Sequence, residues 1–209
     1  NIPDSVTSIG GGAFSGCSSL TSVTIGNSVT NIPNNAFALC GKLTNVTLGN
    51  SVTSIGMCAF SGCISLTSVE IPDSVTNIRT GVFEHCANLK SVKIPNSVTN
   101  IGDTVFHGCK SIESIIIPDS VTSIGEETFN KCSSLKSITI PDCVTSIGVS
   151  AFYGCSSLTN VNIPNRVTTI EKYAFYECVN LPSITIPDNV TSIGNYAFRG
   201  CSSLAYVTI

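Results

Sequence analysis

The feature that most constrains this chain is an internal repeat of 23 residues. An aliphatic residue returns every 23 residues from Ile2 to Ile209, and nine complete units run from 2 to 208 without an insertion or deletion. We number each unit from this residue, which is position 1. Periods of 20–50 residues are typical of solenoids, in which each unit is one supersecondary element stacked on the next. The sequence therefore predicts a single repeat domain over 1–209.

Eight positions of the unit are apolar in all or nearly all repeats. Val stands at position 5, Ile at position 8, Phe at position 13 and Cys at position 16 in all nine units. Positions 1, 19 and 22 are aliphatic throughout, and position 12 is Ala, Val or Thr. One unit is too small to hold a core of its own, so stability must come from contacts between neighbouring units. We expect these eight positions to face the interior of a stack.

The order of residues within the unit predicts mainly extended structure. Positions 20 to 1, such as 21–25, alternate polar and apolar residues and are rich in β-branched types, which indicates a half-buried strand. Pro-Asp or Gly-Asn at positions 2 and 3 ends that strand with a turn. Val-Thr-Ser-Ile at positions 5–8 forms a second short extended piece. The following x-x-A-F-x-x-C segment is compatible with one or two helical turns.

The motifs themselves resemble a known family. The segment from Leu20 to Ile25, L-T-S-V-T-I, fits the first half of the leucine-rich-repeat consensus, L-x-x-L-x-L. The remainder, I-P-x-S-V-T-x-I-x-x-x-A-F-x-x-C-x-x-L, closely resembles the BspA-like leucine-rich repeat family along the whole chain. This resemblance implies a right-handed leucine-rich-repeat solenoid. One side would carry a parallel sheet of short strands, and the other side short helical turns or extended segments.

The resemblance also implies a function. It points to a cell-surface or extracellular location and to adhesion to proteins of the extracellular matrix. We therefore expect a module that binds a protein or glycan ligand through a face of the solenoid. We also expect 1–209 to be a fragment of a longer protein, because neither end carries a polar capping unit.

Eleven cysteines raise the question of disulfides. Nine of them share position 16: Cys17, Cys40, Cys63, Cys86, Cys109, Cys132, Cys155, Cys178 and Cys201. In a ladder their Cβ atoms would lie about 4.8 Å apart with parallel bond vectors, whereas a disulfide needs about 3.8 Å. The sequence therefore predicts a column of buried free thiols that pack as small apolar side chains.

No pattern of residues indicates catalysis, a cofactor or a metal. The sequence lacks G-x-S-x-G, H-E-x-x-H, Cys/His pairs at metal-ligand spacing and a phosphate-binding glycine loop. His85 and His107 occupy adjacent positions of consecutive units, and we expect two solvated side chains near each other. The ten Lys and Arg are scattered, which argues against nucleic acid as a partner. No stretch approaches the roughly 20 apolar residues that insertion into a membrane requires.

The outward positions of the strand, 21 and 23, are the first candidate binding surface. Most of these residues are Ser or Thr. Glu70, Lys93 and Ile116 depart from that pattern on three successive units. Glu70 and Lys93 should be cross-strand neighbours, either as a simple surface ion pair or as part of a contact hot spot. The candidate ligand-binding residues of this face are Asn45, Glu70, Lys93, Ile116, Asn160, Asn162 and Tyr206.

A secondary aromatic patch is the other candidate. All five tyrosines fall in the last three units, and four of them occupy positions 11 and 14, on either side of the inward Phe. We expect Tyr153 to stack on Tyr176 and Tyr173 on Tyr196. Exposed tyrosine is enriched in protein interfaces, but these rings could instead cover the outer side or one end of the stack.

Two other functions stay open. A rigid spacer that presents another domain would explain why positions 20 to 23 vary so little. Rows of Thr at positions 6 and 23 could also suit an ice-binding or mineral-binding surface.

Overall fold

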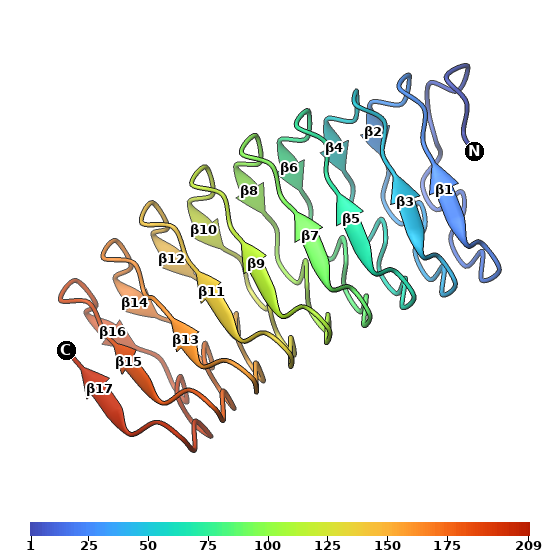
Figure 1. The fold of residues 1–209 in the computed structure, drawn as a ribbon. Helices are drawn as coiled ribbons and strands as arrows, with labels where there is room; N and C mark the ends of the chain where they lie inside the picture. The colour runs from blue at the N-terminus through green and yellow to red at the C-terminus, as the bar shows by residue number, and fades with distance from the viewer.

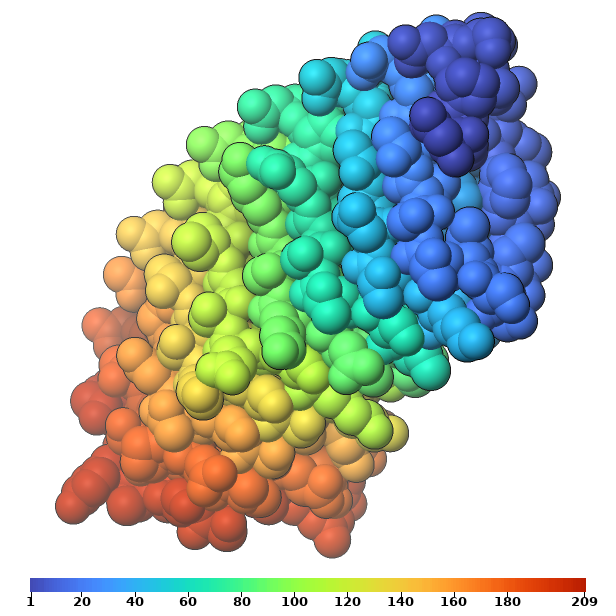
Figure 2. Space-filling view, turned by 45° about the vertical axis from the view of Figure 1, so that its right-hand side comes forward, coloured from blue at the N-terminus to red at the C-terminus, as the bar shows by residue number.

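The computed structural model describes all residues 1–209 as an elongated stack of coils with the termini at opposite ends (Figure 1). Each 23-residue unit makes one coil, and Figure 2 shows the coils as successive bands of colour across the surface. No segment is helical. The fold is a parallel β-solenoid, as the sequence predicts.

Positions 21–23 form the first ladder of strands. Its members are β1 (Ser22–Thr24), β3 (Asn45–Thr47), β5 (Ser68–Glu70), β7 (Ser91–Lys93), β9 (Ser114–Ile116), β11 (Ser137–Thr139), β13 (Asn160–Val161), β15 (Ser183–Thr185) and β17 (Tyr206–Thr208). Paired strands are parallel and in register, so each residue lies beside the one 23 places on, as Val23 does beside Val46. This ladder is divided into four sheets, with breaks between β3 and β5, β7 and β9, and β13 and β15.

Positions 7 and 8 form a second ladder. Its members are β2 (Asn31–Ile32), β4 (Ser54–Ile55), β6 (Asn77–Ile78), β8 (Asn100–Ile101), β10 (Ser123–Ile124), β12 (Ser146–Ile147), β14 (Thr169–Ile170) and β16 (Ser192–Ile193). These strands make one uninterrupted eight-stranded parallel sheet. The second ladder therefore joins the coils from the second to the ninth even where the first ladder is broken.

The third side of the coil, positions 9–16, is held by alternating hydrogen bonds. The N–H groups at positions 11, 13 and 15 donate to the next coil; that of Phe106, for example, lies 2.9 Å from the carbonyl oxygen of Thr128. Those at positions 14 and 16 donate three residues back, as Cys109 does to Phe106 at 3.0 Å. This arrangement leaves no room for the i to i−4 bonds of an α-helix.

Backbone conformation explains why this segment turns instead of coiling into a helix. Positions 11 and 15 have a positive φ, between 53° and 82°, in all nine coils. Such left-handed residues end a helix, since L-residues do not continue in that region. Helical turns, one of the two alternatives that the sequence leaves open for this side of the coil, therefore do not form. Seven of the nine residues at position 11 are not glycine, so nothing in the residue types signalled the left-handed turn.

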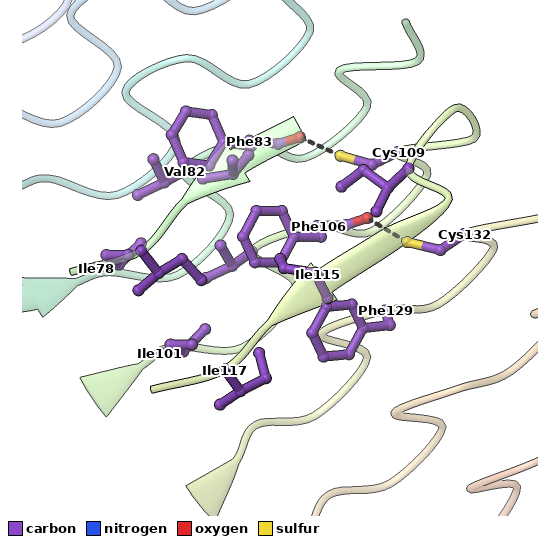
Figure 3. Packing of buried hydrophobic residues seen from close by; sticks show 14 of the residues in the cluster. Ile78, Val82, Phe83, Ile101, Phe106, Cys109, Ile115, Ile117, Phe129 and Cys132 are labelled. Carbon is purple, nitrogen blue, oxygen red and sulfur yellow. Dashed lines mark hydrogen bonds between the residues drawn. The ribbon is translucent and has the colours of Figure 1, made fainter. Parts of the chain in front are cut away.

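The core is the set of inward positions predicted from the repeat. Phe37 to Phe175, at position 13, are fully buried and form a column whose adjacent ring centroids lie 5.3–5.9 Å apart, with nearly parallel planes (Figure 3). The Ile residues at position 8 and the aliphatic residues at positions 1 and 22 surround this column. Among the inward positions, only those of the first and last coils, which have a neighbour on one side, leave apolar residues such as Phe14 and Phe198 partly exposed.

The cysteines form the expected buried column, with eight of nine buried and only Cys17 of the first coil exposed. Each thiol from Cys40 onward donates a hydrogen bond to the carbonyl oxygen of the Phe in the preceding coil, at Sγ–O distances of 3.1–3.2 Å. Burial raises the pKa of Cys132 to about 12, so this thiol stays protonated and remains a donor at neutral pH.

The stack has a finer alternation with a period of two coils. Position 15 is Gly in coils 1, 3, 5, 7 and 9 and is Leu39, His85, Lys131 or Glu177 in the coils between. Each of these longer side chains lies against the glycine that follows it. A Cβ on Gly62 would lie 2.8 Å from Cδ2 of Leu39, and one on Gly108 would lie 2.6 Å from Nδ1 of His85. The structural unit is therefore a pair of coils.

Candidate binding surface on the strand face

The first ladder presents a mostly polar surface, which we call the strand face. In its three-residue strands up to β15 the middle residue is buried and both flanking residues are exposed. Positions 21 and 23 therefore point to solvent, as predicted. Because most of them are Ser, Thr or Asn, the few charged or large residues define the chemistry of this surface.

Charged and apolar side chains gather at the middle of the strand face, in what we call the central patch. Its members are Glu70, Lys90, Lys93, Glu113, Ile116 and Lys136. The prediction that Glu70 and Lys93 are cross-strand neighbours is confirmed: they are paired in register and Lys93 Nζ lies 2.9 Å from Glu70 Oε1. Ile116, on the next coil, is 82% exposed.

A second ion pair at position 20 lies at the opposite end of the strands. Lys136 Nζ is 2.7 Å from Glu113 Oε2, and Lys90 stands on the coil before Glu113. These three residues are not among the predicted ligand-binding residues. Each of them stands at position 20, which is Thr in the first three coils. Departure from the repeat at exposed positions was the signal that could have found them.

Each ion pair shifts the pKa of one of its members in the direction that keeps that member charged. The hydrogen bond from Lys136, followed by its charge, lowers the pKa of Glu113. The hydrogen bond to Glu70, followed by the charge of that carboxylate, raises the pKa of Lys93. Because these groups are exposed, the pairs contribute little to folding, and their charges stay available to a partner.

Two shallow hollows lie beside breaks in the strand ladder. One is lined by residues of β3 and β5 and the turns after them, including Asn45 and Asp73, and reaches Lys93. The other crosses β5, β7 and β9 and is lined by Glu70, Lys93 and Ile116 among others. The central patch therefore differs from the rest of the strand face in both its shape and its chemistry.

The other predicted residues of the strand face do not join the central patch. Asn160 is exposed beyond it on β13, and Tyr206 is exposed on the last strand, β17. The side-chain amide of Asn162 is engaged with the backbone of Ile140, directly after the neighbouring strand β11. It accepts from the N–H of Ile140 at 2.9 Å and donates to the carbonyl of the same residue at 2.8 Å.

The tyrosines form a second cluster, on the side of the coil made by positions 9–16. Both predicted stacks are present: the ring centroids are 4.7 Å apart for Tyr153 and Tyr176, and 5.4 Å apart for Tyr173 and Tyr196. The two stacks meet edge to face between Tyr173 and Tyr176, at 5.6 Å. We call these four residues the tyrosine cluster.

The two histidines also lie together, with ring centroids 5.1 Å apart. His85 is exposed as predicted, but the prediction that His107 is solvated is wrong, since its side chain is only 16% exposed. Its Nδ1 lies 3.0 Å from Oε2 of Glu127 on the next coil. A neighbour from the adjacent coil is the reason for this burial, and a single unit of sequence does not reveal it.

No three side chains among His, Cys, Asp and Glu are grouped so that they could hold a metal ion. The chain contains no helix with the length and apolar character that crossing a membrane demands.

Stacked 23-residue coils with an exposed strand face define a leucine-rich-repeat solenoid, a repeat scaffold with an extended surface. The sequence matches the family described as "BspA type Leucine rich repeat region (6 copies)" over residues 1–113 and 99–209. The chain belongs to this BspA-type leucine-rich repeat family.

Solved structures agree with this assignment. A leucine-rich repeat protein from Bacteroides ovatus is 27% identical with a TM-score of 0.63, over 97% of this chain and 69% of its own. The T. pallidum leucine-rich repeat protein is 31% identical with a TM-score of 0.61, over 88% of this chain and 77% of its own. None of the curated proteins matches the chain.

Proposed function

We propose that this chain is a cell-surface or extracellular binding module that recognises a protein ligand through the central patch. The main support for this proposal is the contrast between the central patch and the rest of the strand face. Small polar residues fill most of it, whereas two ion pairs and the exposed Ile116 lie together on neighbouring coils. Membership in the BspA-type family supports the surface location and an adhesive role toward extracellular-matrix proteins.

The chemistry of the patch favours a protein over a glycan. An exposed aliphatic side chain gains by being covered with apolar area, which the proposed ligand would supply. Charges of both signs around it provide orientation and selectivity more than affinity. A matching ligand surface would therefore carry an apolar anchor flanked by one acidic and one basic group.

The repeat supplies a mild variant for the test. Thr is the most common residue at positions 20 and 23, so replacing all six residues of the central patch by Thr converts the patch to the common surface. A control variant, Asn77→Ser with Asn100→Ser, makes equally mild changes on the second ladder, where Ser is common at position 7. Both should keep the melting temperature of the parent chain.

The experiment is a binding screen against extracellular-matrix proteins and glycans by surface plasmon resonance. We expect at least one matrix protein to bind the parent and the control, and the patch variant to bind it at least about tenfold more weakly. Equal affinity of all three would remove the central patch as the site.

The regularity of the remaining strand face favours a second candidate, a rigid spacer that presents another domain. Those residues offer little chemistry beyond a regular polar surface. A spacer would bind no member of the same screen, which separates the two functions.

A further inference from the structure

The core does not need the tyrosine cluster in order to be covered. In coils 2 and 3 the corresponding positions hold Asn35, Ala38, Cys58 and Ser61, yet the Phe of these coils is fully buried. Covering the phenylalanine column therefore does not require a tyrosine at position 11 or 14. The rings of the last three coils add aromatic area that the fold itself does not use.

Two cations are held against this cluster. Lys172 Nζ lies 4.7 Å from the ring centroid of Tyr173. Arg199 Cζ lies 5.3 Å from the centroid of Tyr196 and 6.0 Å from that of Tyr176. Both side chains are exposed, and no acidic side chain forms an ion pair with either of them. Their charges are thus ordered by the rings but not neutralised by a salt bridge.

The arrangement of the rings and cations favours a protein ligand over a sugar. Sugars are held by aromatic side chains through open ring faces, but here each ring stacks one face on a neighbouring ring, and the two cations lie over Tyr173, Tyr176 and Tyr196. Ring edges, phenolic hydroxyls and cationic tips remain for a partner. These groups suit apolar side chains and carboxylates, and Tyr and Arg are the residues most enriched at the centres of protein interfaces.

Stacking also prepares the cluster for binding. Four rings fixed by one another and by two cations lose little conformational freedom when a partner arrives, which lowers the entropic cost of association. Two acidic residues, Glu171 and Glu177, follow or precede members of this surface in the sequence, but neither forms an ion pair with Lys172 or Arg199. The two cations therefore stay available to an acidic partner.

We propose that the tyrosine cluster with Lys172 and Arg199 is a second binding surface, separate from the central patch, for an extended protein segment that carries carboxylates beside apolar side chains. The carboxylates pair with the two cations and with the tyrosine hydroxyls, and the apolar side chains cover the ring edges.

The test measures binding of a fluorescein-labelled ten-residue peptide of alternating Glu and Leu by fluorescence anisotropy. A peptide of alternating Lys and Leu controls for charge, and a heparin octasaccharide represents an anionic glycan. Replacements come from the repeat itself: Tyr173→Ser, Tyr176→Ser and Tyr196→Asn form the tyrosine variant, and Lys172→Asn with Arg199→Ser the cation variant. A control variant, Lys42→Ser with Lys90→Thr, removes two cations elsewhere.

We expect saturable binding of the Glu-Leu peptide, at least tenfold tighter than that of the Lys-Leu peptide and weaker at high salt. Both the tyrosine and the cation variants should weaken it at least tenfold, and the control variant should bind like the parent. Should the tyrosine variant fold poorly, the cation variant alone decides. The proposal is overturned if the Glu-Leu peptide does not saturate, if the cation variant binds it undiminished, or if only heparin binds.

Discussion

The thiol of Cys109 donates a hydrogen bond to the carbonyl oxygen of Phe83 in the preceding coil, with Sγ and O 3.1 Å apart (Figure 3). The same oxygen accepts the N–H of Cys86 at 3.1 Å. Cysteine therefore fills its place in the core as a small apolar side chain that also donates a hydrogen bond. Alanine would be small and apolar but could not donate this hydrogen bond. The hydrogen bond is therefore a physical reason for cysteine at position 16.

Replacing Cys109 by Ala should lower the free energy of unfolding by about 1–2 kcal/mol, because it removes a buried hydrogen bond and leaves a small void. Cys58→Ala, at a half-buried thiol outside the column, should change it by less than about 0.5 kcal/mol. Guanidinium denaturation of both variants checks the difference. Equal losses would mean that the column has no special role.

The buried thiols also predict an alkaline limit to stability. The pKa of Cys132 is raised from 9.0 to about 12 in the folded chain by burial, so the folded state holds a proton that the unfolded state releases. Its contribution is fully present below pH 9 and is lost as pH rises from 9 to about 12. Above pH 9, each such thiol should cost about 1.4 kcal/mol per pH unit.

Denaturation measured between pH 8 and pH 10.5 tests this limit. Stability of the parent should fall steeply above pH 9, and Cys132→Ala should reduce the slope by about one proton. An unchanged slope in the variant would show that this thiol ionises as readily in the folded state.

The left-handed turn at position 11 gives a stabilising substitution. Thr104 has φ 53°, a conformation that is costly for a β-branched residue, whereas glycine occupies the same position in coils 1 and 4. Thr104→Gly should raise the free energy of unfolding by up to about 1 kcal/mol, after the extra flexibility of glycine in the unfolded chain is subtracted. Thermal denaturation of the variant tests this expectation, and a loss of stability would contradict backbone strain at Thr104.

The two-coil alternation predicts coupling between Leu39 and Gly62. Gly62→Ala should cost more than Gly154→Ala, although both positions have a positive φ. The reason is that the new Cβ meets Leu39 Cδ2 at 2.8 Å in one case, and only Lys131 Cγ at 3.6 Å in the other. Leu39→Gly should recover the excess in a double-mutant cycle. Additive effects would mean that the two coils are independent.

How far the sequence predicts this protein depends on whether a feature repeats. The strand at positions 21–23, the buried Phe and Cys columns and the tyrosine stacks follow from spacing alone, since residues 23 apart must become neighbours. The left-handed turns do not, because Thr104, Tyr173 and other ordinary residues adopt them under constraint from bonds between coils. The amide of Asn162 contacts the residue after the neighbouring strand, and His107 is covered by Glu127 of the next coil. Both features depend on single contacts, which no periodicity encodes.

The most direct test of the 23-residue cycle compares two adjacent isoleucines of β9. Ile115, at position 22, is buried in the core, and Ile116, at position 23, points to solvent. Ile115→Thr should lower the free energy of unfolding by about 1–3 kcal/mol, because it buries a hydroxyl in an apolar site, and Ile116→Thr should change it by less than about 0.5 kcal/mol. Equal effects of the two substitutions on denaturation would contradict the division of side chains between core and solvent by their position in the 23-residue unit.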